Sequence, residues 1–196
     1  MPTPDPAVPP LPAGAAEKAE LRRHFQALRD AAAAADRAAW SGRICGHIAA
    51  LCAARGFRRV GAFAPFRSEV DLRPLQAAQP GTAWLFPRVV SRNPPRLAWG
   101  GPPLVPGTWG LLEPADTPYP LPPVQLLLVP GLAFAADGQR LGYGKGFYDD
   151  TLAALPGDVV TLAVGFHLQR CERLPAGPMD RPVQGLATEV GITWFR

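Results

Sequence analysis

Cysteine is scarce in this sequence, and its arrangement argues against two common roles. Cys45, Cys52 and Cys171 are the only three, and no two of them form a CxxC pair. An odd and small number of cysteines argues against a disulfide framework, and the lack of a CxxC pair argues against a zinc ribbon. We interpret the three as reduced thiols that pack in the core.

Long apolar runs are also absent, which argues against a membrane protein. No run approaches the ~20 residues that a membrane-spanning helix needs, and the first residues lack the basic-then-apolar order of a signal peptide. We therefore expect a soluble, cytoplasmic protein with no membrane partner.

Lysine is nearly absent, because Lys18 and Lys145 are the only two. Arginine supplies the other cations, and 20 Lys and Arg against 16 Asp and Glu give a net charge of +4. This excess suits an anionic partner without selecting one, since nucleotides, polyglutamylated small molecules and nucleic acid all fit. The rarity of lysine makes the position of each one informative.

The 196 residues, of which 47% are hydrophobic and 18% charged, suffice for one domain with a sizeable core. Six of the 25 prolines lie in residues 1–14, so we predict a disordered, proline-rich tail there and a single domain over 15–196. A second stretch rich in proline and glycine, Asn93 to Pro123, also carries tryptophan and leucine. We expect it to be an ordered loop that forms a wall of a cleft.

Apolar periodicity predicts helices that alternate with strands. Leu21, Phe25 and Leu28 form one stripe of a helix that starts near Ala15, and a second helix is expected over Asp36–Arg55. Strands are expected at Arg59–Ala64, Thr82–Phe86, Leu97–Trp99, Gln125–Val129 and Val159–Gly165, with further helices at Asp71–Ala78 and Phe147–Leu155. The pattern favours an α/β fold, a three-layer sandwich with a largely parallel, Rossmann-like central sheet flanked by helices. Ligands of such sheets bind at the carboxyl ends of the strands.

A glycine-rich segment follows the predicted central strand. Its glycines, Gly142, Gly144 and Gly146, stand at every second position before a predicted helix, so the backbone can approach a ligand and the helix amides can face a phosphate. Arg140 and Lys145 add positive charge. The spacing matches neither a Walker A loop nor the Rossmann fingerprint, and a glycine run alone fits a structural turn as well as a phosphate site.

The whole string is more specific. D-G-Q-R-L-G-Y-G-K-G-F-Y-D, from Asp137 to Asp149, follows V-P-G-L-A-F and resembles the hallmark of the 5-formyltetrahydrofolate cyclo-ligase family, with a one-residue shortening after Asp137. Further matches lie at Lys18 and Arg22, at residues 68–71, 87–89 and 109–114, at Gln169, and at Leu174-Pro175 with Asp180. The resemblance spans about Glu17 to Thr188. It implies ATP-dependent closure of 5-formyltetrahydrofolate to 5,10-methenyltetrahydrofolate with release of ADP and phosphate.

The resemblance also implies roles for individual residues. Arg140 and Lys145 would be catalytic. ATP would be bound by Lys18, Arg22, Arg140, Leu141, Gly142, Tyr143, Gly144, Lys145, Gly146, Phe147 and Tyr148. The folate would contact Glu69, Tyr143, Gly144, Lys145, Gly146 and Phe147, and on physical grounds also the aromatic residues Phe66 and Trp109. Asp149 and Asp180 would hold Mg²⁺, the expected cofactor, with ATP as co-substrate.

Other interpretations stay open. Lys18 and Arg22 alone would fit a solvated cationic face, Asp180 would fit a turn, and Asp150 competes with Asp149 as the metal ligand. A non-catalytic relative could keep the fold and bind RNA or a nucleotide, although the arginines are scattered and no basic–aromatic array is visible. A sugar-phosphate or CoA-handling enzyme would bind phosphate without requiring ATP. We expect small-molecule substrates rather than nucleic acid, and favour a monomer while the oligomeric state stays open.

Overall fold

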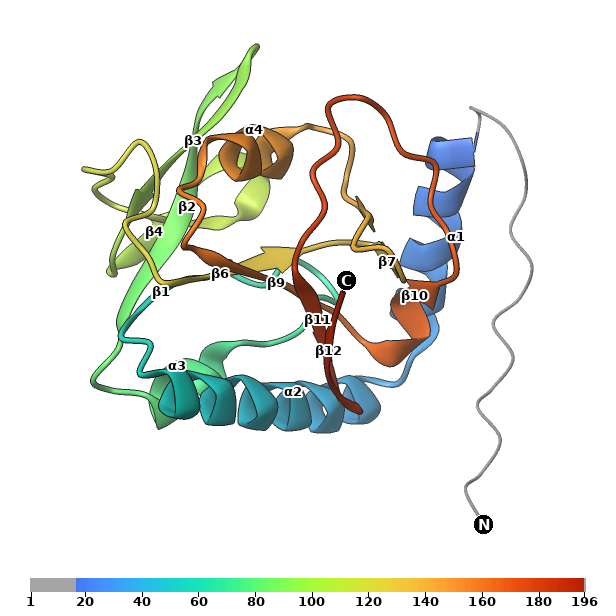
Figure 1. Cartoon of the computed structure of the whole chain (residues 1–196), viewed down its shortest axis with the longest axis horizontal. Helices are drawn as coiled ribbons and strands as arrows, with labels where there is room; N and C mark the ends of the chain where they lie inside the picture. The colour runs from blue at the N-terminus through green and yellow to red at the C-terminus, as the bar shows by residue number, and fades with distance from the viewer. Residues whose placement is uncertain (1–16, 196) are drawn as a thin grey trace.

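A computed structural model describes residues 17–195 of the chain, so the predicted tail at 1–14 lies outside the described residues. Its centre is a seven-stranded sheet in the order β12-β11-β9-β6-β1-β2-β3 (Figure 1). The strands are β1 (Arg59–Gly61), β2 (Ala83–Arg92), β3 (Pro95–Gly100), β6 (Leu126–Pro130), β9 (Val160–Val164), β11 (Gly185–Thr188) and β12 (Gly191–Trp194). The five inner strands are parallel, and β3 and β12 are antiparallel edges. The largely parallel sheet that the sequence predicts is therefore confirmed.

Helices cover both faces of this sheet (Figure 1). The helix α2 (Ala34–Arg55) lies along one face with the short α3 (Arg73–Ala78), and α4 (Phe147–Ala154) lies on the other. Alternate residues of β6 belong to two different cores: Leu126 and Leu128 pack on the α2 side, and Leu127 and Val129 pack on the α4 side. A strand buried on both faces reads as a continuous apolar run, which is why the sequence could identify it.

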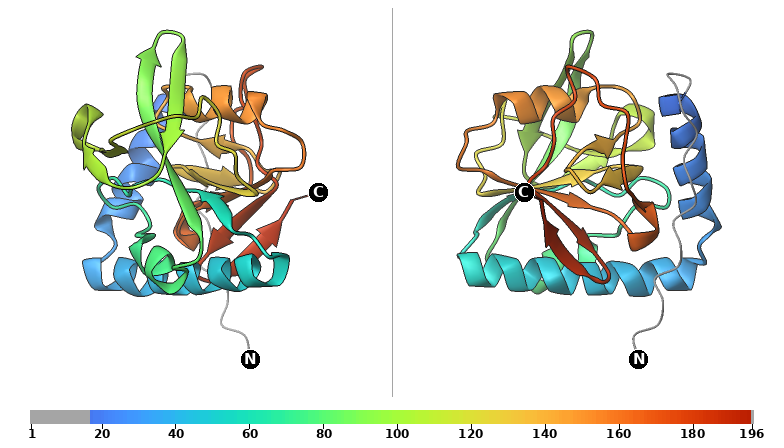
Figure 2. Two further views of the ribbon diagram at one scale, coloured as in Figure 1. Left: turned by 90° about the vertical axis from the view of Figure 1, so that its left-hand side faces the viewer. Right: turned by 45° about the vertical axis from the view of Figure 1, so that its right-hand side comes forward.

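The first helix and a small second sheet stand beside the main sheet (Figures 1 and 2). The helix α1 (Glu17–Ala31) buries Leu21 and Phe25 against β7 (Ala133–Ala135), β8 (Arg140–Leu141) and β10 (Arg170–Cys171), which form one three-stranded sheet. Two strands, β4 (Leu104–Pro106) and β5 (Leu112–Pro114), pair separately around the 3₁₀ turn η1 (Thr108–Gly110), and a second such turn, η2, spans His167–Gln169.

The structure corrects several predicted boundaries. β1 ends at Gly61 instead of Ala64, whereas β2 continues six residues past Phe86 and forms an antiparallel hairpin with β3. This hairpin extends beyond the rest of the sheet (Figure 2). The three cysteines are free and buried, as predicted. Among residues 17–195, no helix combines the length and the apolar character needed to cross a membrane.

Candidate active site

A cavity of about 1010 Å³ opens where β1 and β6 end. Phe63 and Ala64, just after β1, and Pro130, the last residue of β6, line it. From this pair of strands the chain order runs outward in opposite directions across the sheet. A reversal of this kind leaves a crevice at the carboxyl edge, where doubly wound sheets bind their ligands.

All the site residues predicted from the sequence line this one cavity. They come from α1, from the loop after β1, from the 3₁₀ turn η1, from β8 and the start of α4, and from the loop before β11: Lys18, Arg22, Phe66, Glu69, Trp109, Arg140, Leu141, Gly142, Tyr143, Gly144, Lys145, Gly146, Phe147, Tyr148, Asp149 and Asp180. Residues of the 93–123 stretch also line it, among them Pro94, Pro95 and Leu112. The stretch is thus a wall of the cleft, as its composition indicates, but it is not a loop throughout, because β3, β4 and β5 lie within it.

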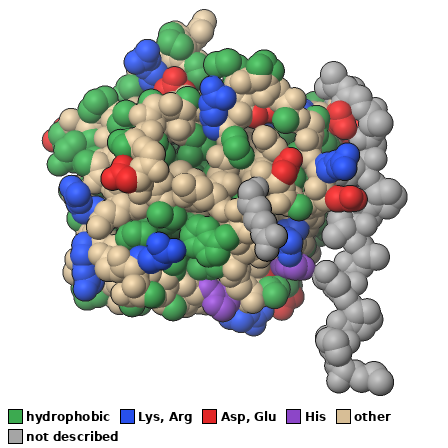
Figure 3. Space-filling model, in the orientation of Figure 1, with side chains coloured by type: hydrophobic (Ala, Val, Ile, Leu, Met, Phe, Trp, Pro, Cys, Tyr) green, Lys and Arg blue, Asp and Glu red, His purple; other side chains and the backbone are tan. Residues whose placement is uncertain are grey.

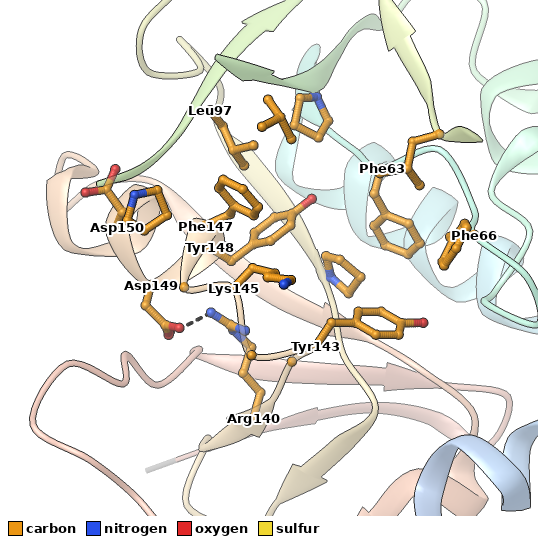
Figure 4. A pocket seen from close by; sticks show the side chains of 18 of the residues that line it. Phe63, Phe66, Leu97, Arg140, Tyr143, Lys145, Phe147, Tyr148, Asp149 and Asp150 are labelled. Atoms are coloured by element: carbon orange, nitrogen blue, oxygen red, sulfur yellow. Dashed lines mark hydrogen bonds and ion pairs between the residues drawn. The ribbon is translucent and has the colours of Figure 1, made fainter. Parts of the chain in front are cut away.

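The glycine segment connects β8 to α4 by a tight turn. Gly144 and Gly146 have φ angles of +82° and +75°, which side chains other than glycine rarely adopt. Gly146 is the residue before α4 and offers no side-chain cap, so the first amides of the helix are available to an anion. Lys145, between these two glycines, extends into the middle of the cavity (Figure 4).

The helix α1 contributes two cations to the same end of the cavity. Arg22 Nε donates to the carbonyl oxygen of Gly142 at 2.9 Å, and Lys18 Nζ lies 2.5 Å from Asp180 Oδ2. Burial opposes ionisation of Asp180, but the contacts from Lys18 and from the Gly177 amide hold the pKa of this carboxyl below its ordinary value. The Lys18 and Arg22 pair is therefore part of the cavity wall and not a solvated face.

Arg140 and Asp149 form a partly buried ion pair below the glycine segment. Arg140 Nη2 lies 2.8 Å from Asp149 Oδ1, and the Arg140 side chain is only 4% exposed. Burial lowers the pKa of Arg140, and the nearby carboxylates of Asp149 and Asp180 oppose that effect. The Arg140 Nε atom is buried with no partner among the described residues, so the cation keeps an unused donor. Asp150 points away from Arg140 (Figure 4).

A carboxylate and several rings form a different part of the cavity wall. Glu69 Oε2 accepts a hydrogen bond from the Phe66 amide at 2.9 Å. Burial raises the pKa of Glu69, while that amide, the charge of Arg29 and a hydrogen bond with Tyr143 oppose the rise. Rings pair nearby, Phe66 with Tyr143 and Trp109 with Phe147, both with centroids 6.2 Å apart. This part of the wall suits a flat heterocycle that presents N–H donors.

Comparison with known proteins identifies the family of the chain. The profile of the 5-formyltetrahydrofolate cyclo-ligase family matches residues 14–189, which is most of the chain. The chain belongs to that family.

The similar proteins carry corresponding names. A 5-formyltetrahydrofolate cyclo-ligase of Mus musculus is 36% identical over 70 residues, 34% of either chain, and one of Mycolicibacterium smegmatis is 36% identical over 80 residues, 39% of this chain and 41% of that one. The matched segments thus span well under two thirds of these curated relatives.

Two solved structures match over nearly the whole fold. The 5,10-methenyltetrahydrofolate synthetase of Aquifex aeolicus is 31% identical with a TM-score of 0.78, covering 91% of this chain and 93% of that one. The synthetase of Mycoplasma pneumoniae is 19% identical with a TM-score of 0.73, covering 88% and 99%. At that identity the second likeness shows the fold alone.

Two buried residues near the site received no role from the sequence: Arg29, which lies outside the matched motifs, and Glu113, which lies within the matched segment 109–114. Arg29, on α1, is 1% exposed and contacts the loop that carries Glu69. Glu113 is 4% exposed and lies 3.8 Å from Arg88 Nε, which ties β5 to β2. Gln169, in contrast, binds the Phe166 amide and the carbonyl groups of Gly131 and Leu132, so its role is structural. Arg29 stands eleven positions after Lys18, three helical turns, and this spacing could have identified it.

The family implies Mg²⁺, and the residues present fit it. No group of three or more His, Cys, Asp or Glu side chains gathers around a metal position within residues 17–195. The loops of Asp149 and Asp180 do meet, because the Arg181 amide donates to Asp149 Oδ1 at 3.2 Å. Within the described part of the chain, Asp149 Oδ2 and Asp180 Oδ1 have no protein donor. Two free carboxylate oxygens beside the glycine segment match Mg²⁺, which takes few protein ligands and completes its shell with other oxygen ligands such as water.

Gly144→Ala should weaken nucleotide binding. A Cβ there would lie 2.9 Å from Arg22 Cζ, so the Arg22 side chain would have to move, and the positive φ would add roughly 1–2 kcal/mol of strain. We expect a several-fold rise in KM for ATP in steady-state kinetics. Gly157→Ala is the control, since nothing lies within 4 Å of its Cβ position; equal effects of the two changes would contradict the role of Gly144.

Proposed function

We propose that this protein converts 5-formyltetrahydrofolate to 5,10-methenyltetrahydrofolate with consumption of ATP, in the presence of Mg²⁺, and releases ADP and phosphate. The observation that carries the proposal is that one cavity joins a glycine-rich anion cradle to a carboxylate set among aromatic rings. A nucleotide phosphate suits the first part and a pterin suits the second. Membership in the cyclo-ligase family supports both assignments.

The chemistry requires activation of a poor leaving group. The formyl oxygen of the substrate attacks the γ-phosphorus of ATP, the bond to the β–γ bridging oxygen breaks, and ADP leaves. N10 of the folate then attacks the activated formyl carbon, the carbon–oxygen bond breaks, phosphate leaves, and N10 loses its proton. Both steps need alignment and neutralisation of phosphate charge more than a protein nucleophile.

The side chains at the cradle supply that charge and alignment. Lys145 and the spare donor of Arg140 would neutralise the transferring phosphoryl group, and the first amides of α4 would bind phosphate oxygens. Lys18 and Arg22 would bind the nucleotide beside them. Asp149 and Asp180 would hold Mg²⁺, which when bound supplies positive charge to the phosphate oxygens.

The other part of the cavity would bind the pterin. Its amino-pyrimidinone edge presents N–H donors, and the Glu69 carboxylate accepts hydrogen bonds from such an edge. Phe66 and Trp109 would line the faces of the ring. The substrates are therefore small molecules, while a monomeric state and a cytoplasmic location stay predictions.

Scattered cations support small-molecule substrates over a nucleic acid. Lys and Arg side chains are spread over the face that Figure 3 shows and form no continuous basic surface there. A nucleic-acid site would need such a patch or stripe. The non-catalytic alternative is therefore less well supported than the enzyme.

A direct assay tests the proposal. Purified protein mixed with MgATP and 5-formyltetrahydrofolate should produce the absorbance band of the methenyl product and ADP in equal amounts. ADP formation should stop when the folate is left out. ATP hydrolysis that is independent of folate would refute the proposed reaction. Nucleotide binding without turnover would support the non-catalytic relative, and phosphate binding with no use of ATP would support the sugar-phosphate enzyme.

A further inference from the structure

Arg29 is the most deeply buried cation near the site, and it has no role in the proposed binding of ATP or in the proposed reaction. Its side chain is among the largest fully buried ones, with 1% exposure. At 100° per residue, Lys18, Arg22 and Arg29 lie within about 40° of one another around α1, with Arg29 about 16 Å along the axis from Lys18. The same face of α1 that meets the glycine segment therefore also reaches the loop of Glu69.

Two hydrogen bonds connect Arg29 to the loop that carries Glu69 and to the glycine segment. Arg29 Nε donates to Ser68 Oγ at 3.0 Å, and Arg29 Nη2 donates to the Tyr143 hydroxyl at 2.8 Å. Ser68 in turn donates to Asp30. Because the Tyr143 oxygen accepts from Arg29, its own proton is directed elsewhere. Burial and, after it, the charge of Glu69 raise the pKa of Tyr143, so the hydroxyl and the Glu69 carboxylate lie close together.

The electrostatics of this network are unusual for a structural arginine. Among the described residues, no carboxylate lies within ion-pair distance of Arg29, and both of its hydrogen bonds go to neutral hydroxyl groups. Burying a cation in this way costs free energy unless another charge compensates. The nearby charge that interacts with it is Glu69. The two residues therefore stabilise each other across Tyr143.

We propose that Arg29 is a positioning residue, which acts through the Tyr143 hydroxyl to hold the Glu69 carboxylate in place for the folate. This inference rests on the proposed function. It makes α1 a support for both substrates: Lys18 and Arg22 serve the nucleotide, and Arg29 serves the folate. The loss of Arg29 should therefore affect the two substrates unequally.

Kinetics of Arg29→Met test this inequality. We expect KM for 5-formyltetrahydrofolate to rise about tenfold or more, whereas KM for ATP should stay within about twofold. Arg29→Lys should recover part of the loss, because one ammonium keeps the charge but cannot bridge both hydroxyl groups. Arg23→Met is the matched control, an exposed arginine on the same helix, and should change neither constant. Equal changes in both KM values would show a merely structural role.

The pH profile gives a second readout that a structural role would not move. The groups that face Glu69 are Arg29 of α1, the Phe66 amide, Tyr143 of the glycine segment and Tyr148 of α4. Arg29 lowers the pKa of Glu69, so its removal should raise that pKa. The acid limb of kcat/KM for the folate should then shift to higher pH. An unshifted limb would overturn the inference.

Tyr143→Phe tests the same path from Arg29 to Glu69 even if Arg29→Met fails to fold. It removes only the hydroxyl group of a half-exposed side chain, leaves Arg29 bonded to Ser68, and should reproduce the rise in KM for the folate. Where both variants fold, the double variant should be no worse than the poorer single one. Additive losses would overturn the proposed path through Tyr143.

Direct binding separates this inference from the proposed reaction. Titration with 5-formyltetrahydrofolate, followed by tryptophan fluorescence, measures binding without turnover. Wild-type protein that binds the folate but forms no methenyl product would refute the reaction, while weaker binding by Arg29→Met would still support the positioning role. Wild-type protein that does not bind the folate would overturn both.

Discussion

Lys145→Ala is expected to lower kcat/KM for MgATP by roughly 30- to 1,000-fold, about 2 to 4 kcal/mol of transition-state stabilisation. Lys145 lies between two glycines with positive φ and extends into the cavity. It is exposed and, among residues 17–195, forms no ion pair. Its removal therefore takes charge from the proposed phosphate site without removing an ion pair that stabilises the fold. Thermal unfolding should be unchanged.

Arg140→Ala should be equally inactive but should also be less stable. Arg140 is buried, and its loss leaves the partly exposed Asp149 carboxylate without its ion-pair partner, so the variant should be destabilised by more than the ~1 kcal/mol typical of an exposed pair. Arg43→Ala, an exposed arginine of α2, is the control for both variants. Normal activity of Lys145→Ala and Arg140→Ala would refute the assignment of the cradle.

The strands that the sequence predicts well are those whose pattern does not depend on their neighbours. β6 and β9 are buried on both faces, so each reads as a short apolar run. β11 and β12, with four residues each, and β8, with two, are too short to carry a period. Their pairing depends on tertiary contacts. The extension of β2 past Phe86 begins with Pro87, which weakens a strand prediction, and its partner β3 holds it in place.

The candidate site likewise has one part that the sequence predicts and one part that it does not. The glycine segment and its charges are consecutive in the chain, so a linear motif contains most of the cradle. The support for Glu69 comes from Arg29 and Tyr143, which are separated by 114 positions, and no local pattern connects them. The aromatic chemistry of Trp109, more than its place in the matched segment 109–114, predicts that it lines the pocket, and the structure places it in the cavity wall. Contacts between distant segments become visible only when the chain is folded.

Asp149→Asn is expected to raise the Mg²⁺ requirement and to cut turnover severely. The amide oxygen can still accept hydrogen bonds from Arg140 and from the Arg181 amide, so the local contacts survive while the negative charge is lost. Mg²⁺ prefers carboxylate oxygens, and it takes only one or two from the protein. The loss should therefore appear as a shift of the Mg²⁺ titration of initial rates to higher concentration.

Asparagine variants of Asp150 and Asp180 provide the comparisons for that experiment. Asp150→Asn should have little effect, because Asp150 points away from Arg140 (Figure 4). Asp180→Asn should lie between the two, since it removes both a potential metal ligand and the partner of Lys18. If Asp149 and Asp180 serve only as partners of Arg140 and Lys18, their asparagine variants will have lower turnover at every Mg²⁺ concentration. The midpoint of the Mg²⁺ titration will then be unchanged. A larger loss in Asp150→Asn would assign the metal to the other carboxylate of this turn.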